Sequence, residues 1–175
     1  MSKYPLVLGL ATVVIVLDQV TKWMVRDSFV LYESRPVIEG FFHLTYVRNP
    51  GGAFSFLRDV DASIRLPFFI GVASVAVVAL LWFVREIEAH QRWMLAALGL
   101  VLGGAVGNLI DRIAFGEVVD FLDVFWRDHH WPAFNVADSG ISVGMTILVV
   151  LTLFSKEPPS AGADGEAANS GTHPN

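Results

Sequence analysis

The sequence predicts an all-α membrane protein with four transmembrane helices, a small β hairpin and an interfacial segment. Three observations support this fold class. Hydrophobic residues make up 54% of the 175 residues. The mean hydropathy is +0.55, which is well above that of soluble globular chains. Four apolar segments, at residues 4–17, 66–84, 93–110 and 139–155, contain no Asp, Glu, Lys or Arg.

Each apolar segment reaches the roughly 20 residues that a spanning helix needs once its flanks are included. Because backbone groups in hydrocarbon must be satisfied within the segment, and the alternation of a β barrel is missing, the segments are predicted to be helices. The first segment continues into "LDQVTKWMV" without a small-residue cleavage site, so we interpret it as a retained helix rather than a signal peptide. We expect one domain over residues 1–155 and a polar, disordered tail over residues 156–175.

The polar residues collect at one end of the predicted bundle. Four helices joined by three connections alternate in direction, so the end of the first helix, the start of the second, the end of the third and the start of the fourth share one membrane face. The residues at this face are Asp18, Gln19, Lys22, Asn108, Asp111, Arg112, Asn135 and Asp138. The sequence therefore predicts a site at this end.

Two longer connections lie at the same face. In residues 26–63, "FFHLTYV" alternates at the period of a strand and "RNPGGAF" supplies turn residues, which together predict a β cradle at about 37–57. Residues 113–134 are rich in aromatic side chains and are predicted to be an interfacial segment on the membrane surface. The distribution of arginines leaves the orientation in the membrane open, because one face has more of them and the other has the denser short connection.

Composition excludes several chemistries. The chain contains no cysteine, which excludes disulfides, thiol catalysis and thiolate metal ligands. Its net charge of -5 provides no basic surface for nucleic acid. The adjacent His129 and His130 lack a carboxylate pattern at metal-ligand spacing, so we predict neither a metal site nor a cofactor.

The charged residues of the first and third helices each have a structural interpretation. Asp18 and Lys22 are four residues apart, so they lie on one helix face and can form an ion pair that fixes the helix end. Catalysis by Asp18 is the alternative. Arg112 is either a snorkelling anchor at a helix end or a site residue beside Asn108 and Asp111. Glycines of the third helix recur every four residues, which favours close helix packing over a groove for lipid.

Asp120 and Asp138 are the strongest candidates for chemistry. They lie on different elements, before and after the connection that returns from the third helix to the fourth. Two carboxylates at close range share a proton, so that one activates water as a general base and the other donates to a carbonyl oxygen. This is the chemistry of an aspartyl peptidase. Helix capping would explain Asp138 but would leave Asp120 unexplained.

Two other classes of protein compete with a peptidase. An ion-coupled transporter would place ionisable residues near the midplane of the membrane, beside broken helices. Here these residues collect at one end. A non-catalytic membrane scaffold would make the paired aspartates incidental.

Five motifs, "LDQVTKW", "RNPGGAF", "GGAVGNLIDR", "VVDF" and "FNVADS", resemble those of lipoprotein signal peptidases, in the same order. The resemblance covers residues 17–141. It implies an aspartic endopeptidase of the bacterial inner membrane that removes signal peptides from prolipoproteins, immediately before a cysteine that carries a diacylglyceryl group. It also implies an active site at the periplasmic face, with the cradle and the interfacial segment, and both termini in the cytoplasm.

The resemblance carries residue roles and partners with it. Asp120 and Asp138 match the catalytic dyad. Positions that hold the substrate or support the dyad are matched by Asn49, Asn108, Arg112 and Asn135, and the residues that look structural are Asp18, Lys22 and Asp111. The expected partners are lipidated prolipoproteins, membrane lipid and peptide inhibitors of the globomycin type, bound by a monomer without metal or nucleic acid.

Overall fold

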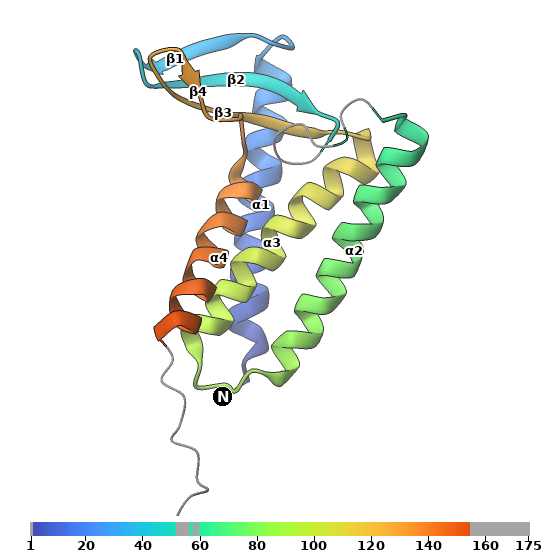
Figure 1. Ribbon diagram of the computed structural model, residues 1–175, viewed down its shortest axis with the longest axis vertical. Helices are drawn as coiled ribbons and strands as arrows, with labels where there is room; N and C mark the ends of the chain where they lie inside the picture. The colour runs from blue at the N-terminus through green and yellow to red at the C-terminus, as the bar shows by residue number, and fades with distance from the viewer. Residues whose placement is uncertain (1, 52–56, 58–59, 155–175) are drawn as a thin grey trace, which may run out of the picture.

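The structure is a computed structural model that describes residues 2–51, 57 and 60–154. Its helices are α1 (Tyr4–Ser28), α2 (Ala62–Glu86), α3 (Arg92–Phe115) and α4 (Val136–Phe154). All four are long and apolar enough to cross a membrane, which confirms the predicted fold class. Figure 1 shows the helices side by side, with the strands gathered at one end. The predicted disordered tail lies outside the described residues, as do residues 52–56 of the predicted cradle.

Helix α3 is the centre of the bundle and packs against the other three helices. Glycines on α3 let two of these neighbours approach closely. A Cβ added at Gly103 would lie 2.7 Å from the carbonyl oxygen of Ala11 on α1, and one added at Gly104 would overlap the carbonyl oxygen of Ala137 on α4. The predicted close packing along the glycines of this helix is therefore confirmed.

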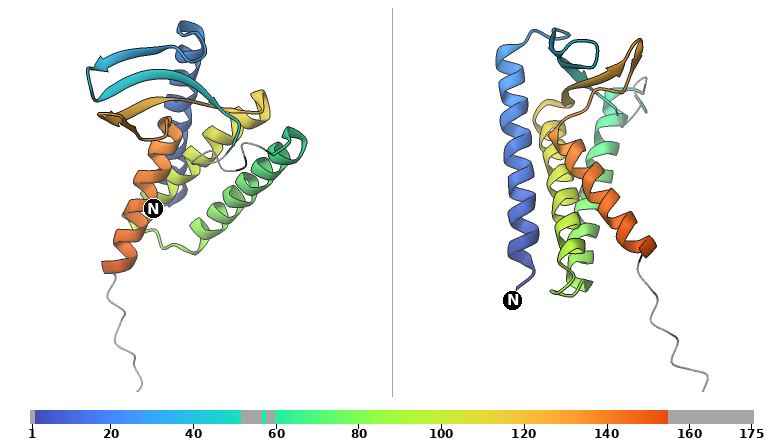
Figure 2. Two further views of the ribbon diagram at one scale, coloured as in Figure 1. Left: turned by 45° about the horizontal axis from the view of Figure 1, so that its top comes forward. Right: turned by 90° about the vertical axis from the view of Figure 1, so that its left-hand side faces the viewer.

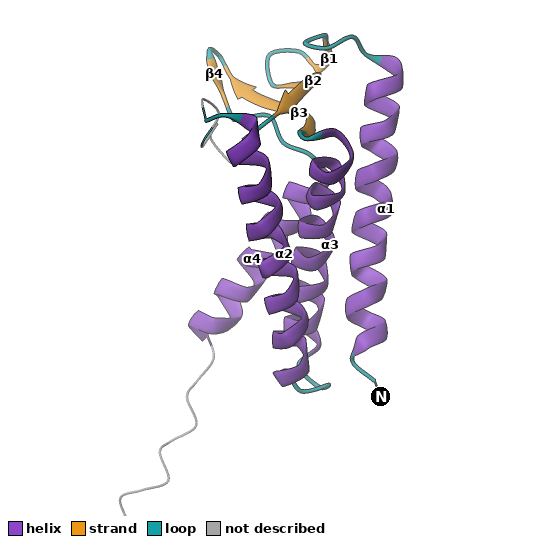
Figure 3. Cartoon of the chain, turned by 90° about the vertical axis from the view of Figure 1, so that its right-hand side faces the viewer, coloured by secondary structure: helices purple, strands orange, loops and turns teal. Residues whose placement is uncertain are grey.

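The strands form one sheet across the end of the bundle. They are β1 (Ser34–Ile38), β2 (Phe42–Asn49), β3 (Val118–Trp126) and β4 (His129–His130), and they pair antiparallel in the order β1-β2-β3-β4. The hairpin predicted from "FFHLTYV" is present as β1 and β2, although it begins earlier, at Ser34. Figures 2 and 3 show the sheet lying over one set of helix ends.

Strand β3 comes from the connection that was predicted to be an interfacial segment, residues 113–134. The first residues of that connection complete α3, and Gly116, whose φ of 77° is left-handed, turns the chain from the helix into the strand. The sequence does not show a strand here because residues 118–121 are all buried, so apolar and polar side chains do not alternate. Pairing of β3 with β2 brings Asp120 into the sheet.

Alternate residues of β3 face a small apolar core between the sheet and the helix ends. Val119 and Phe121 pack there with Tyr46 of β2 and Val25 of α1. Because side chains alternate along a strand, Asp120 points to the other side of β3. That side faces a cavity at the sheet end of the bundle.

Candidate active site

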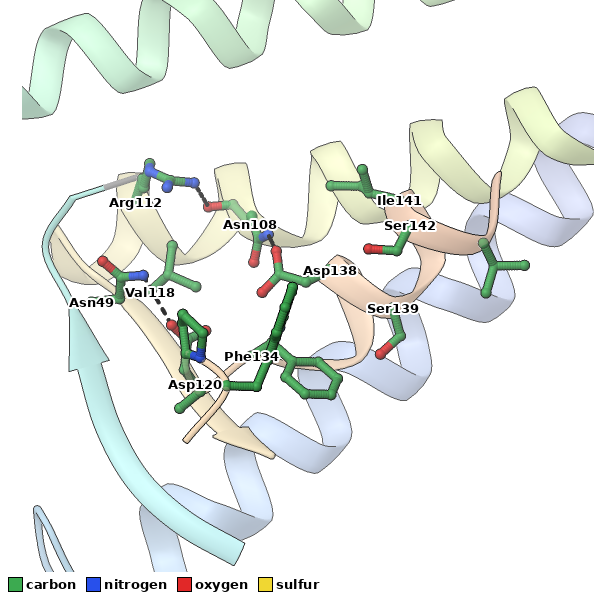
Figure 4. A pocket seen from close by; sticks show the side chains of 14 residues that line it. Asn49, Asn108, Arg112, Val118, Asp120, Phe134, Asp138, Ser139, Ile141 and Ser142 are labelled. Atoms are coloured by element: carbon green, nitrogen blue, oxygen red, sulfur yellow. Dashed lines mark hydrogen bonds between the residues drawn. The ribbon is translucent and has the colours of Figure 1, made fainter. Parts of the chain in front are cut away.

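The cavity at the sheet end of the bundle has a volume of about 650 Å³. Its polar lining comes from four elements, and includes Asn49 of β2, Asn108 and Arg112 of α3, Asp120 of β3 and Asp138 of α4. Residues 131–134 form part of the remaining wall. Figure 4 shows Asp120 and Asp138 projecting toward the same space from β3 and α4.

Asp120 is held by two side-chain amides and is only 3% exposed. Asn49 Nδ2 donates to its Oδ2 at 3.0 Å, and Asn135 Nδ2 donates to its Oδ1 at 2.7 Å. Burial, followed by the negative charge of Asp138, raises the pKa of Asp120 to about 7, although the two hydrogen bonds oppose this shift. Near neutral pH, Asp120 can therefore either hold or release a proton.

Asp138 lies in the first turn of α4. Its backbone N–H donates to Asn135 Oδ1 at 2.9 Å, and the backbone N–H of Asn135 donates back to Asp138 Oδ2 at 3.3 Å. This reciprocal pair is a capping box at the start of the helix. Asn108 Nδ2 donates to the other carboxylate oxygen, Oδ1, at 2.7 Å. Oδ2 of Asp138 therefore takes part in capping the helix, whereas Oδ1 accepts a hydrogen bond from Asn108 on α3.

Asn135 connects the two aspartates and is completely buried. Its Oδ1 accepts the Asp138 N–H, while its Nδ2 donates to Asp120 Oδ1. The preceding residue, Phe134, exchanges backbone hydrogen bonds with Leu122 of β3. The chain thus returns along β3 before it enters α4, and this return makes Asp120 and Asp138 converge.

A completely buried ion cluster of Lys22, Asp18 and Asp111 lies beside this pair. Lys22 Nζ is 2.8 Å from Asp18 Oδ2 and 3.0 Å from Asp111 Oδ2, so the predicted Asp18–Lys22 ion pair is present. Asp18 Oδ1 accepts the backbone N–H of Ala137 at 2.9 Å, and Asp111 Oδ2 accepts that of Val119 at 3.0 Å. Each carboxylate of the cluster thus holds the residue that directly precedes one aspartate of the cavity.

Arg112 reaches across the cavity from α3. Its Nη2 donates to the carbonyl oxygen of Gly51 at 3.2 Å, and its Nη1 donates to that of Asn108 at 3.3 Å. The guanidinium carbon lies 5.1 Å from the ring centre of Phe69 on α2, which is within the range of a cation–π contact. These contacts favour a site residue over a snorkelling anchor.

The structure brings all the residues predicted for the site to the same end of the bundle; they are Asp18, Lys22, Asn49, Asn108, Asp111, Arg112, Asp120, Asn135 and Asp138. Gln19 was noted at this end without a role, yet its Nε2 donates to Asp111 Oδ1 at 3.0 Å and to the carbonyl oxygen of Gly107 at 3.2 Å. The sequence pattern that could have indicated this role is the position of Gln19 three residues before Lys22, on the same helix face.

His129 and His130 do not line the cavity. His129 and His130 form the exposed strand β4, and His130 Nδ1 lies 2.8 Å from Asp123 Oδ1, a contact that the spacing in the sequence did not predict. Within the described part of the chain, no group of three His, Cys, Asp or Glu side chains is arranged to hold a metal ion.

The spanning helices and the cavity define a multi-pass membrane protein with a carboxylate site at one end of its bundle. A family model described as Signal peptidase (SPase) II matches residues 10–154, which is more than half of the chain. The chain therefore belongs to the signal peptidase II family, and it is a membrane protease.

Relatives named lipoprotein signal peptidase match most of the chain. The lipoprotein signal peptidase of Syntrophotalea carbinolica is 51% identical over 150 residues, which is 86% of this chain and 92% of that protein. The one from Geobacter sulfurreducens is 54% identical over 136 residues, which is 78% of this chain and 84% of that protein.

Two solved structures, both described as bacterial membrane enzymes, share the fold with TM-scores of 0.76. One is 30% identical and the match covers 92% of this chain and 93% of that chain. The other is 32% identical, with 86% and 94% covered.

Proposed function

We propose that this protease is an aspartic endopeptidase that removes signal peptides from lipoprotein precursors, immediately before a cysteine that carries a diacylglyceryl group. The observation that carries the proposal is the pair Asp120 and Asp138 in one cavity, at the end of an apolar helix bundle. The relatives are lipoprotein signal peptidases, which supports the substrate class. The acyl chains of such a substrate would stay in the bilayer, beside the bundle, while its peptide bond meets the aspartates.

In this proposal the two carboxylates act as a general base and a general acid. The ionised carboxylate takes a proton from water as the water oxygen attacks the scissile carbonyl carbon, and the protonated carboxyl donates to the carbonyl oxygen. The intermediate collapses as a proton moves to the nitrogen and the C–N bond breaks. The products are a free carboxyl group on the signal peptide and a free amine on the cysteine. A pKa of about 7 for Asp120 supports a pair that shares one proton.

The remaining site residues divide into two groups. Asn108 and Asn135 donate to the aspartates and support them, whereas Asp18, Lys22 and Asp111 hold the framework. Asn49 and Arg112 hold the substrate backbone near the aspartates. The guanidinium of Arg112 carries five N–H donors, more than its contacts with the described residues use, so it can also bind a substrate carbonyl oxygen.

The proposal also includes the setting of the enzyme. Residues 1–155 form a monomeric peptidase domain in the bacterial inner membrane, with both termini in the cytoplasm and the cavity at the periplasmic face. Catalysis uses no metal or cofactor. Membrane lipid surrounds the bundle, and peptide inhibitors of the globomycin type bind at the aspartates. The grouping of the site residues at the sheet end supports a site at one membrane surface rather than at the midplane.

Cleavage of synthetic peptides by the purified protein tests this function. A prolipoprotein peptide with a diacylglyceryl cysteine should be cut once, directly before the cysteine, and the same peptide without lipid should be a poor substrate. Mass spectrometry of the products locates the cut. A chelator should leave the rate unchanged. An intact lipidated peptide, a cut elsewhere, or a loss of activity with chelator that added zinc restores would contradict the proposal.

A further inference from the structure

Lys22 carries a completely buried ammonium group whose three N–H donors all have acceptors. Two acceptors are the carboxylates of Asp18 and Asp111, at 2.8 and 3.0 Å. The third is the side-chain oxygen of Asn108, at 3.0 Å. Because an ammonium group has donors and no acceptor, only an oxygen of Asn108 fits at this place.

The side-chain amide of Asn108 therefore has one orientation. Its Oδ1 accepts from Lys22 Nζ and, at 3.2 Å, from Asn135 Nδ2. Its Nδ2 donates to Asp138 Oδ1 at 2.7 Å. Reversing the amide would place its N–H groups against the ammonium group of Lys22 and the amide of Asn135, and its oxygen against the carboxylate of Asp138. All three contacts would then be repulsive.

Building on the proposed function, we infer that Lys22 is a positioning residue for the reaction, whose ammonium group fixes the amide of Asn108 so that an N–H donor is directed at Asp138. Lys22 acts from behind Asn108, since it is completely buried and Asn108 lines the cavity. This role is separate from the helix-fixing ion pair with Asp18.

The same ammonium group acts on Asp120 through its charge. The charged groups that face Asp120 are Asp138 of α4, Arg112 of α3 and Lys22 of α1. Burial has the largest influence and raises the pKa of Asp120, whereas the positive charge of Lys22 lowers it. Removing that charge should therefore raise the pKa of Asp120, and the aspartates would keep their proton to a higher pH.

A comparison of Lys22→Met with Gln19→Met tests this role. Gln19 is half-buried beside the same cluster, but its hydrogen bonds go to Asp18, Asp111 and the carbonyl oxygen of Gly107. Lys22→Met should lower kcat about tenfold or more, with little change in KM, because the donor to Asp138 is no longer fixed. The alkaline limb of its pH profile should move to higher pH. Gln19→Met should leave that limb in place.

A second comparison covers the case in which Lys22→Met does not fold because it leaves two buried carboxylates without a countercharge. The double variant Asp18→Asn/Lys22→Met is compared with Asp18→Asn, in which an amide oxygen can still accept the Ala137 N–H. The double variant should again show the lower kcat and the alkaline shift.

Three outcomes would overturn the inference. The first is a kcat and a pH profile that do not change when Lys22 is removed, in either comparison. The second is an alkaline shift in Gln19→Met that equals the shift in Lys22→Met. The third is failure of both Lys22 variants to fold. The last would assign Lys22 to assembly of the bundle alone. The proposed function is judged separately, since it stands as long as the wild-type protein cuts the lipidated peptide and Asp120→Asn does not.

Discussion

Two pairs of aspartates lie at the same end of the bundle and differ in what surrounds them. Asp18 and Asp111 share the ammonium group of Lys22, and each also accepts a backbone N–H. Asp120 and Asp138 line the cavity and accept hydrogen bonds from uncharged amides. Neighbouring carboxylates of the same chain thus lie in opposite electrostatic environments.

The surroundings of each pair indicate the role that its carboxylates can have. The ammonium group of Lys22, at about 3 Å, binds both carboxylates of the first pair and so joins α1 to α3. In the second pair, burial and the negative charge of Asp138 raise the pKa of Asp120 to about 7, so Asp120 can exchange a proton near neutral pH. The framework pair also binds the residues that precede the cavity pair, so the cavity carboxylates depend on the framework pair for their position.

The largest expected effect comes from substitutions in the cavity pair. Asp120→Asn and Asp138→Asn should each lower the turnover of the lipidated peptide by about 1000-fold or more, and the double variant should be hardly worse, because members of one catalytic unit are not additive. Both proteins should still insert and fold. A single variant that keeps more than about a tenth of the turnover, a barrier change of only ~1.4 kcal/mol, would remove the distinction between the pairs.

Substitution in the framework pair should affect stability instead. Asp111→Ala leaves Lys22 with one carboxylate and the Val119 N–H without its acceptor, so it should lower the free energy of unfolding by about 3–5 kcal/mol. Thermal unfolding in detergent measures this. The control is Glu88→Ala, which removes an exposed contact with His90 and should leave the unfolding temperature almost unchanged. Equal unfolding temperatures for the two variants would argue against a structural role for the cluster.

Arg112 is the cation on the cavity side, and its replacement tests whether charge alone is enough there. Arg112→Lys should lower kcat/KM about tenfold, because lysine cannot reproduce the planar guanidinium fork. The protein should fold normally. Arg127→Lys, at an exposed residue of the turn between β3 and β4, is the matched control and should cleave at the wild-type rate. Wild-type cleavage by Arg112→Lys would mean that its hydrogen-bond geometry is not used.

The smallest and most specific effect is on pH dependence. Cleavage should decline as the pH rises through about 7, where Asp120 loses its proton. Folding stability should change in the same direction. The folded pKa of Asp120 lies above its ordinary value of 3.8, so its favourable contribution is fully present below that value and is lost as the pH rises through about 7. Between pH 4 and 8, the pH dependence of the free energy of unfolding should lack this contribution in Asp120→Asn. A variant with the same pH dependence as the wild type would contradict the assigned pKa.

The sequence predicted the helices, the β1–β2 hairpin and the end of the bundle at which the site lies. A chain that crosses the hydrocarbon of a membrane needs long apolar helices. Because successive helices run in opposite directions, the polar ends of these helices lie together. It did not predict β3, because this strand is buried on both faces where it begins. It also could not predict the hydrogen bonds within the site. The amide of Asn108 on α3 is oriented by Lys22 on α1, and such long-range contacts leave no local pattern.

The side chain of Asn135 has two roles at the start of α4. Because one side chain both caps this helix and binds Asp120, we expect the first turn of α4 and the geometry of the aspartates to open together as one local unfolding unit. Amide hydrogen exchange at Asp138 and Ser139 therefore reports the fraction of molecules with an assembled site. A peptide inhibitor that binds the aspartates should slow exchange at these amides, because it stabilises the assembled site.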